Sequence, residues 1–159
     1  MNAVRKTLVA AVCAAALIGG GSATAGATPP TGQVSATPIA RGTIPPLELK
    51  APGFELEQNH SSDFVVAHFT IKPGGSLGWH RHPGPVLISV QKGTLTIEHA
   101  DCTYSRYHAG SAEVEAPRQV HNAWNTSRRT TVKGTAVYLN VPVGGLQRID
   151  AKAPRCARH

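Results

Sequence analysis

The pattern of hydrophobic and polar positions changes after the first part of the chain. Residues 8–18 form an almost unbroken apolar run, whereas residues from 64 onward form short β-branched and aromatic runs separated by turn signals. Outside the first run, no segment sustains a helical period. The pattern therefore predicts an all-β sandwich or barrel. The expected strands are residues 64–71, 85–91, 94–98, 102–107, 113–116, 120–126 and 131–141.

The first residues have the features of a secretory signal peptide. Arg5 and Lys6 precede the apolar run, and the small residues 23–25 suit a cleavage site. The run is short for a membrane span, which makes an uncleaved anchor the weaker alternative. We therefore expect residues 1–27 to be removed after Sec-type export, leaving a secreted or extracytoplasmic chain that is not embedded in a membrane.

The expected mature chain divides into a lead-in and one domain. Residues 28–38 are rich in Pro, Thr, Gly and Ser, which predicts a flexible lead-in. Residues 39–158 then form a single domain. Its first part, residues 39–60, is irregular, and it either drapes over the barrel or adds an edge strand. This arm could also cross to a second copy in a homodimer.

Charge and cysteines narrow the class further. Removal of residues 1–27 leaves 14 Lys+Arg against 9 Asp+Glu, with no basic stretch interleaved with aromatics, so nucleic acid is not an expected partner. Cleavage also leaves two cysteines, Cys102 and Cys156. In an oxidising compartment such a pair indicates one disulfide. A metal site containing cysteine is the weaker alternative, because neither residue has ligand spacing to another candidate.

Spacing singles out three of the eight histidines. His80 and His82 are two positions apart, so on a strand their side chains project to one side about 7 Å apart. His121, in an apolar-flanked run, is the natural third ligand. Imidazole sites of this kind suit Zn, Fe, Cu or Mn, so we predict one divalent ion of unknown identity.

These residues lie in two motifs that resemble those of the cupin superfamily. The first motif is Gly74-x5-His80-x-His82 with Gly93 eleven residues later, and its spacing is intact. In the second, the distances from Gly110 to His121 and on to Asn125 match, although the proline comes one residue late and the inner glycine is missing. The chain looks most like small exported single-domain cupins of actinobacteria. The resemblance implies a double-stranded β-helix, or jelly-roll barrel, and supports the disulfide.

One departure from the family pattern concerns the metal shell. The glutamate that commonly completes it should fall at position 86 or 87, where this chain has Val86 and Leu87, and residues 72–97 contain no carboxylate. We therefore expect three neutral imidazoles, open coordination positions, and no obvious acid or base.

Three functions follow from this pattern. The first is a metal-dependent enzyme, of oxygenase type, acting on a small organic molecule. The second is a non-catalytic protein that binds a metal or a small ligand, and the third is a structural barrel with a vestigial site. The fold alone does not choose among them.

The remaining conspicuous residues have simpler interpretations. Trp79 and Trp124 flank the proposed ligands and are expected to pack in the core. Asn125 is expected to bond the backbone rather than act in catalysis. His68 is the one spare histidine on a strand that could face inward.

Overall fold

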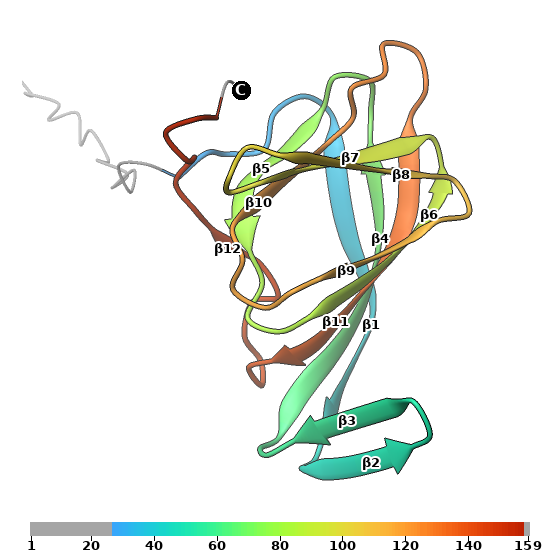
Figure 1. Cartoon of the computed structure of the whole chain (residues 1–159), viewed down its shortest axis with the longest axis vertical. Coiled ribbons are helices and arrows are strands. Elements are labelled where there is room, and N and C mark those ends of the chain that lie inside the picture. The colour runs from blue at the N-terminus through green and yellow to red at the C-terminus, as the bar shows by residue number, and fades with distance from the viewer. Residues whose placement is uncertain (1–26, 158–159) are drawn as a thin grey trace, which may run out of the picture.

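The architecture is two antiparallel β-sheets packed face to face. The computed structural model describes residues 27–157, so almost all of the predicted signal peptide lies outside the described residues. Figure 1 shows the sheets closing into a barrel. The first sheet contains, in spatial order, β1 (Val34–Ile44), β4 (Ser62–Ile71), β11 (Val132–Val141), β6 (Val86–Lys92) and β9 (Ala112–Glu115). The second contains β12 (Ile149–Asp150), β5 (Ser76–Arg81), β10 (His121–Trp124), β7 (Thr94–His99) and β8 (Tyr104–His108).

The strands form where alternating apolar residues can face the space between the sheets. Val86, Ile88 and Val90 on β6 are buried, while Leu87 and Ser89 between them are exposed. This period of two fits a sheet with one face on the core. The expected all-β jelly-roll barrel is thus confirmed. The core cluster contains Phe69, Ile71, Val86, Ile88, Val90, Leu95, Ile97, Ala123, Val132 and Ala136.

The first part of the described chain forms a regular strand where its composition predicts a flexible segment. β1 begins at Val34, inside the segment expected to be a flexible lead-in, and pairs with β4 as an edge strand. Of the two alternatives for residues 39–60, the start of that segment therefore adds an edge strand.

The rest of the arm forms a hairpin that leaves the barrel. β2 (Leu47–Ala51) pairs with β3 (Phe54–Gln58), and Gly53, with a φ of 75°, lies in the turn between them. In Figure 1 this hairpin projects from one end of the molecule. Leu49 and Phe54 on it are more than half exposed, at 52% and 56%.

The C-terminal segment adds an edge strand to the second sheet. β12 pairs with β5, and the Arg148 guanidinium donates a 2.6 Å hydrogen bond to the carbonyl of Leu77. The described residues include no helix long and apolar enough to cross a membrane.

Candidate metal centre

Two neighbouring strands bring three histidines together. β5 carries His80, His82 follows two residues later, and His121 on β10 is the register partner of His80. Because register partners project from the same face of a sheet, the third imidazole meets the first two. Each histidine is at most 4% exposed, and one ligand atom from each lies within 4.8 Å of the others. The structure therefore groups the three residues singled out by spacing.

A hydrogen bond from the Nδ1 nitrogen to a backbone carbonyl orients each imidazole ring. The Nδ1 atoms of His80, His82 and His121 lie 2.7, 2.6 and 3.0 Å from the backbone carbonyl oxygens of Gly78, Gln147 and Gln119 respectively. A carbonyl oxygen only accepts, so each Nδ1 must carry the proton and donate. In the neutral ring this leaves the Nε2 lone pair free for a metal. The donor set thus fits a divalent transition-metal ion.

Burial favours the neutral form of His80. Burial lowers the pKa of the His80 imidazole well below its ordinary value, and the neighbouring charges of His121 and His82 lower it further. A neutral imidazole is the form that binds metal.

A carboxylate also enters the site. Glu115, at the end of β9, is 7% exposed, and its Oε1 and Oε2 atoms lie 3.1 Å from His121 Nε2 and 3.2 Å from His82 Nε2. The three imidazoles are where they were expected, but the expectation that no carboxylate, acid or base lies near them is wrong. The sequence shows no carboxylate between positions 72 and 97, because this one comes from the strand paired with β6.

The carboxylate and the rings change one another's ionisation. Burial raises the pKa of Glu115, but contact with His121 and His82 offsets this and holds that pKa well below its ordinary value. Burial likewise lowers the pKa of His121, whereas Glu115 raises it more, so the His121 pKa is raised overall. Glu115 is therefore an anion at the centre of the site.

Two spaces of different size lie beside the candidate ligands. The interior cavity holds about 30 Å³, close to one water, and is lined by His80, His82, Glu115 and Tyr138 among apolar residues. An open pocket of about 480 Å³ is lined by residues of β7, of β9 and of the segments that follow these two strands, and Glu115 and His121 are among them. The same two side chains therefore line a pocket that solvent can reach.

Tyr138 is a further polar residue that the sequence did not single out. Its ring lies 5.2 Å from that of His82, centroid to centroid. Burial, together with the charge of Glu115, raises the pKa of Tyr138 to about 12. The phenol is therefore protonated at neutral pH and its hydroxyl can donate a hydrogen bond.

The other conspicuous residues do not join the site. His68 is exposed on β4, with its Nδ1 3.0 Å from the Thr135 hydroxyl, so it does not face inward. Trp79 is fully buried, as expected for a core residue. The Asn125 amide donates to the carbonyls of Ile71 and Thr130 at 2.9 and 2.8 Å, which is the expected backbone role.

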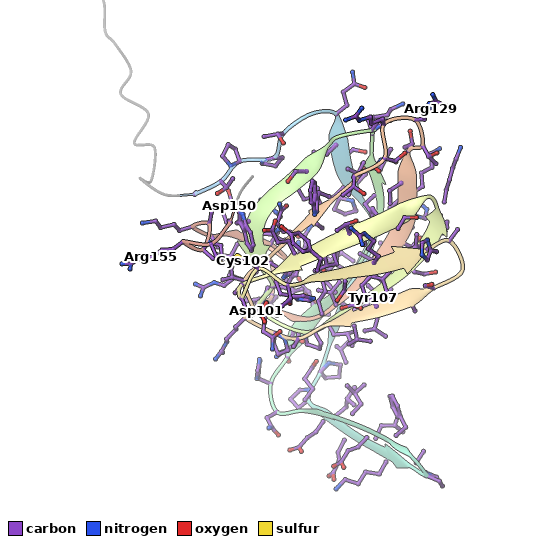
Figure 2. The ribbon with its side chains drawn as sticks, turned by 45° about the horizontal axis from the view of Figure 1, so that its top comes forward. Asp101, Cys102, Tyr107, Arg129, Asp150 and Arg155 are labelled. Carbon is purple, nitrogen blue, oxygen red and sulfur yellow. A yellow bond between two sulfur atoms is a disulfide. The ribbon has the colours of Figure 1, made fainter. Side chains whose placement is uncertain are left out.

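The two cysteines among the described residues are joined. Cys102, in the loop before β8, forms a disulfide with Cys156 in the C-terminal segment, across a sequence separation of 54. Figure 2 shows Cys102 and Asp101 on the side of the barrel where this segment runs, near Asp150. The bond is consistent with an extracellular protein.

Comparison with known proteins agrees with this fold. Residues 67–138 match the model of the Cupin domain family. A cupin-like protein from Thermotoga maritima has a similar structure, with a TM-score of 0.55, 14% identity, and coverage of 80% of this chain and 90% of that one. A conserved protein with a double-stranded β-helix domain from Klebsiella pneumoniae has a TM-score of 0.46, 21% identity, and coverage of 73% and 85%. Among curated proteins, none matches this chain in sequence.

The antiparallel barrel, the two motifs and the family match together define a cupin domain with three histidines positioned to bind a metal. Residues 67–138 therefore match the Cupin domain family, and the fold of the chain is that of a cupin barrel.

Proposed function

We propose that this protein binds one divalent transition-metal ion through His80, His82 and His121 and is a metal-dependent enzyme, of oxygenase type, for a small organic molecule. The observation that supports this most is the set of three Nδ1–carbonyl hydrogen bonds, which direct three Nε2 lone pairs to one place. When bound, the ion would supply Lewis-acid or oxygen-binding chemistry.

The residues around the histidines support a reactive site rather than a closed one. The pocket of about 480 Å³ reaches Glu115 and His121, so a small molecule can approach the ligands from outside the barrel. On the inner side, the protonated Tyr138 hydroxyl can donate a hydrogen bond. The interior cavity there is mostly apolar, and its volume of about 30 Å³ holds about one water. Zn, Fe, Cu and Mn all suit the imidazole donors.

Elemental mass spectrometry tests the metal site directly. The mature chain, purified without chelator or nickel affinity, is expected to carry about one ion per chain, as a site of this donor set does. His80→Ala should lose it, whereas His68→Ala, which removes an exposed histidine from β4, should keep it. A chain without metal that also takes up none of the four ions would contradict the proposal.

A non-catalytic metal-binding protein is the second candidate. The small interior cavity of about 30 Å³ favours it, because no organic molecule fits beside the ion there. Oxygen consumption distinguishes the enzyme from the non-catalytic metal-binding protein. It is measured on the iron-loaded chain with a panel of small phenols, acids and amines. Consumption that depends on one compound and disappears in His80→Ala supports the enzyme, and none with any compound supports the binder.

Export and self-association are also proposals. The disulfide supports export, and the mass of the protein recovered from culture medium, which should lack residues 1–27, tests it. The exposed Leu49 and Phe54 on the projecting hairpin support a homodimer. Light scattering after size-exclusion chromatography gives the mass of the particle, and a monomer mass would contradict that association.

A further inference from the structure

We propose that Glu115 is the fourth protein ligand of the metal, so that the carboxylate of this site is supplied by β9 instead of β6. The inference rests on the proposed function, because it requires that the three histidines bind an ion. It assigns a ligand that the spacing of the two sequence motifs does not reveal.

The place where the family has its glutamate is apolar in this chain. Of the two residues at that place, Val86 is 1% exposed and lines the interior cavity, whereas Leu87 is 43% exposed and faces out. The inward position on β6 therefore carries a side chain that cannot bind a metal.

The register of the sheet places Glu115 beside that position. β6 and β9 pair antiparallel, and Val86 is the register partner of Glu115. Register partners project from the same face with their Cβ atoms about 5 Å apart. A carboxylate on β9 therefore enters the same part of the barrel that a carboxylate at position 86 would enter.

The contacts of Glu115 are those of a ligand. Both carboxylate oxygens lie within 3.2 Å of an Nε2 atom, and these are the nitrogens that the Nδ1 hydrogen bonds leave free for metal. In the described part of the chain, no lysine or arginine pairs with this buried carboxylate. A buried charge is retained only where it is paired or coordinates a metal, and here every paired group is itself a candidate ligand.

Glu113 offers the matched control. It lies two residues earlier on β9, is half-buried, and makes no ion pair with the three histidines, although its charge acts on His121 from a distance. Glu115→Gln keeps the size of the side chain but removes its charge. Glu113→Gln makes the same change on the same strand and removes the same charge, but no direct contact with a histidine ligand.

Two measurements test this assignment. One is the dissociation constant for Zn²⁺, obtained by competition with a chromophoric chelator, and the other is the absorption spectrum of the Co²⁺-loaded chain. We expect Glu115→Gln to weaken zinc binding more than the about 10- to 100-fold that is lost when a residue only supports a ligand, and to change the cobalt spectrum. Glu113→Gln should leave the spectrum unchanged and alter the affinity far less, because only its charge acts on His121. An affinity within about threefold of the original and an unchanged spectrum in Glu115→Gln would overturn the assignment.

Moving the carboxylate back supplies a second test. The variant Val86→Glu/Glu115→Val puts the carboxylate at the register partner, and we expect it to recover most of the lost affinity. If these variants do not fold, the zinc-loaded wild-type crystal structure decides, since a ligand oxygen lies about 2.0–2.2 Å from the ion. Zinc bound by the histidines with Glu115 farther away contradicts only this inference. No zinc binding at all contradicts the proposed function as well.

Discussion

Asp63 shows what one buried carboxylate does at the scale of a residue. It accepts hydrogen bonds from the Arg41 side chain at 2.6 Å, the Thr43 hydroxyl at 2.8 Å and the backbone amide of Gly144 at 2.9 Å. Two of these donors lie on β1 and the third follows β11. The side chain thus ties the edge strand and the loop after β11 to β4.

These contacts predict a pH dependence of stability. The amide of Gly144, the Thr43 hydroxyl and Arg41 hold the pKa of Asp63 below its ordinary value of 3.8. A lowered folded-state pKa stabilises the fold above the unfolded-state pKa, and this stabilisation is lost as pH falls through the folded-state value. Asp63→Asn should therefore melt below wild type at pH 7, with the gap narrowing below about pH 4. Thermal melts at a series of pH values measure this difference in melting temperature between Asp63→Asn and wild type.

Glu48→Gln is the matched control for this experiment, because that side chain is exposed on the hairpin. It should leave the melting temperature nearly unchanged at both pH values. A gap between Asp63→Asn and wild type that is as wide at low pH as at neutral pH would contradict the assigned role.

The residue scale also shows what the sequence could and could not reveal of the site. His80 and His82 were predictable because strand alternation is a local property, and the motif spacing extended this to His121. Glu115 was not, because its position in the site depends on the pairing of β6 with β9. No hairpin turn joins β6 to β9 and fixes their register, so the local sequence does not show that Glu115 lies opposite position 86.

At the scale of elements, Gly78 shapes β5 next to the first ligand. Its φ is +74°, and a Cβ there would lie 2.2 Å from the carbonyl oxygen of Thr28. Its own carbonyl accepts the His80 Nδ1–H hydrogen bond. The glycine is therefore required both by its conformation and by the close approach of the lead-in.

This requirement predicts an ordered series of alanine substitutions. Gly78→Ala should cost about 3 kcal/mol or more, because it adds a backbone clash to the strain of a positive φ. Gly110→Ala, with a φ of +88° and open space, should cost about 1 kcal/mol, and Gly42→Ala, with neither problem, close to nothing. Urea unfolding measures the series. Equal losses at Gly78 and Gly110 would show that the clash is relieved by movement of residues 28–29.

The strands of the barrel were predictable, whereas β1 was only partly so. The expected strands after residue 64 match β4 and β6–β11 within a few residues, because alternation is strong there. Pro38 obscured β1, since a proline removes a ladder hydrogen bond. It is tolerated because β1 is an edge strand and a register shift lies between Pro38 and Ala40.

At the scale of the whole molecule, the disulfide closes a long loop. Cys102 and Cys156 are 54 residues apart, so the bond restricts the unfolded chain strongly. The chain-entropy relation gives roughly 4 kcal/mol for a loop of this length. Cys102→Ser/Cys156→Ser should lose about that free energy of unfolding in guanidinium titrations, and the native chain under reducing agent should lose a similar amount. A loss below about 1 kcal/mol would show that β12 and the contacts of Arg148 hold the segment unaided.

The carbonyl of Gln147 gives this bond a consequence for the order in which the protein matures. Gln147 holds the His82 ring, and it lies in the same C-terminal segment that the disulfide fastens to the loop before β8. A newly made chain with reduced cysteines would hold that ring less firmly and take up metal more weakly. In a chain exported as proposed, the disulfide would then form before the metal is loaded, so the ion would be collected outside the reducing interior of the cell.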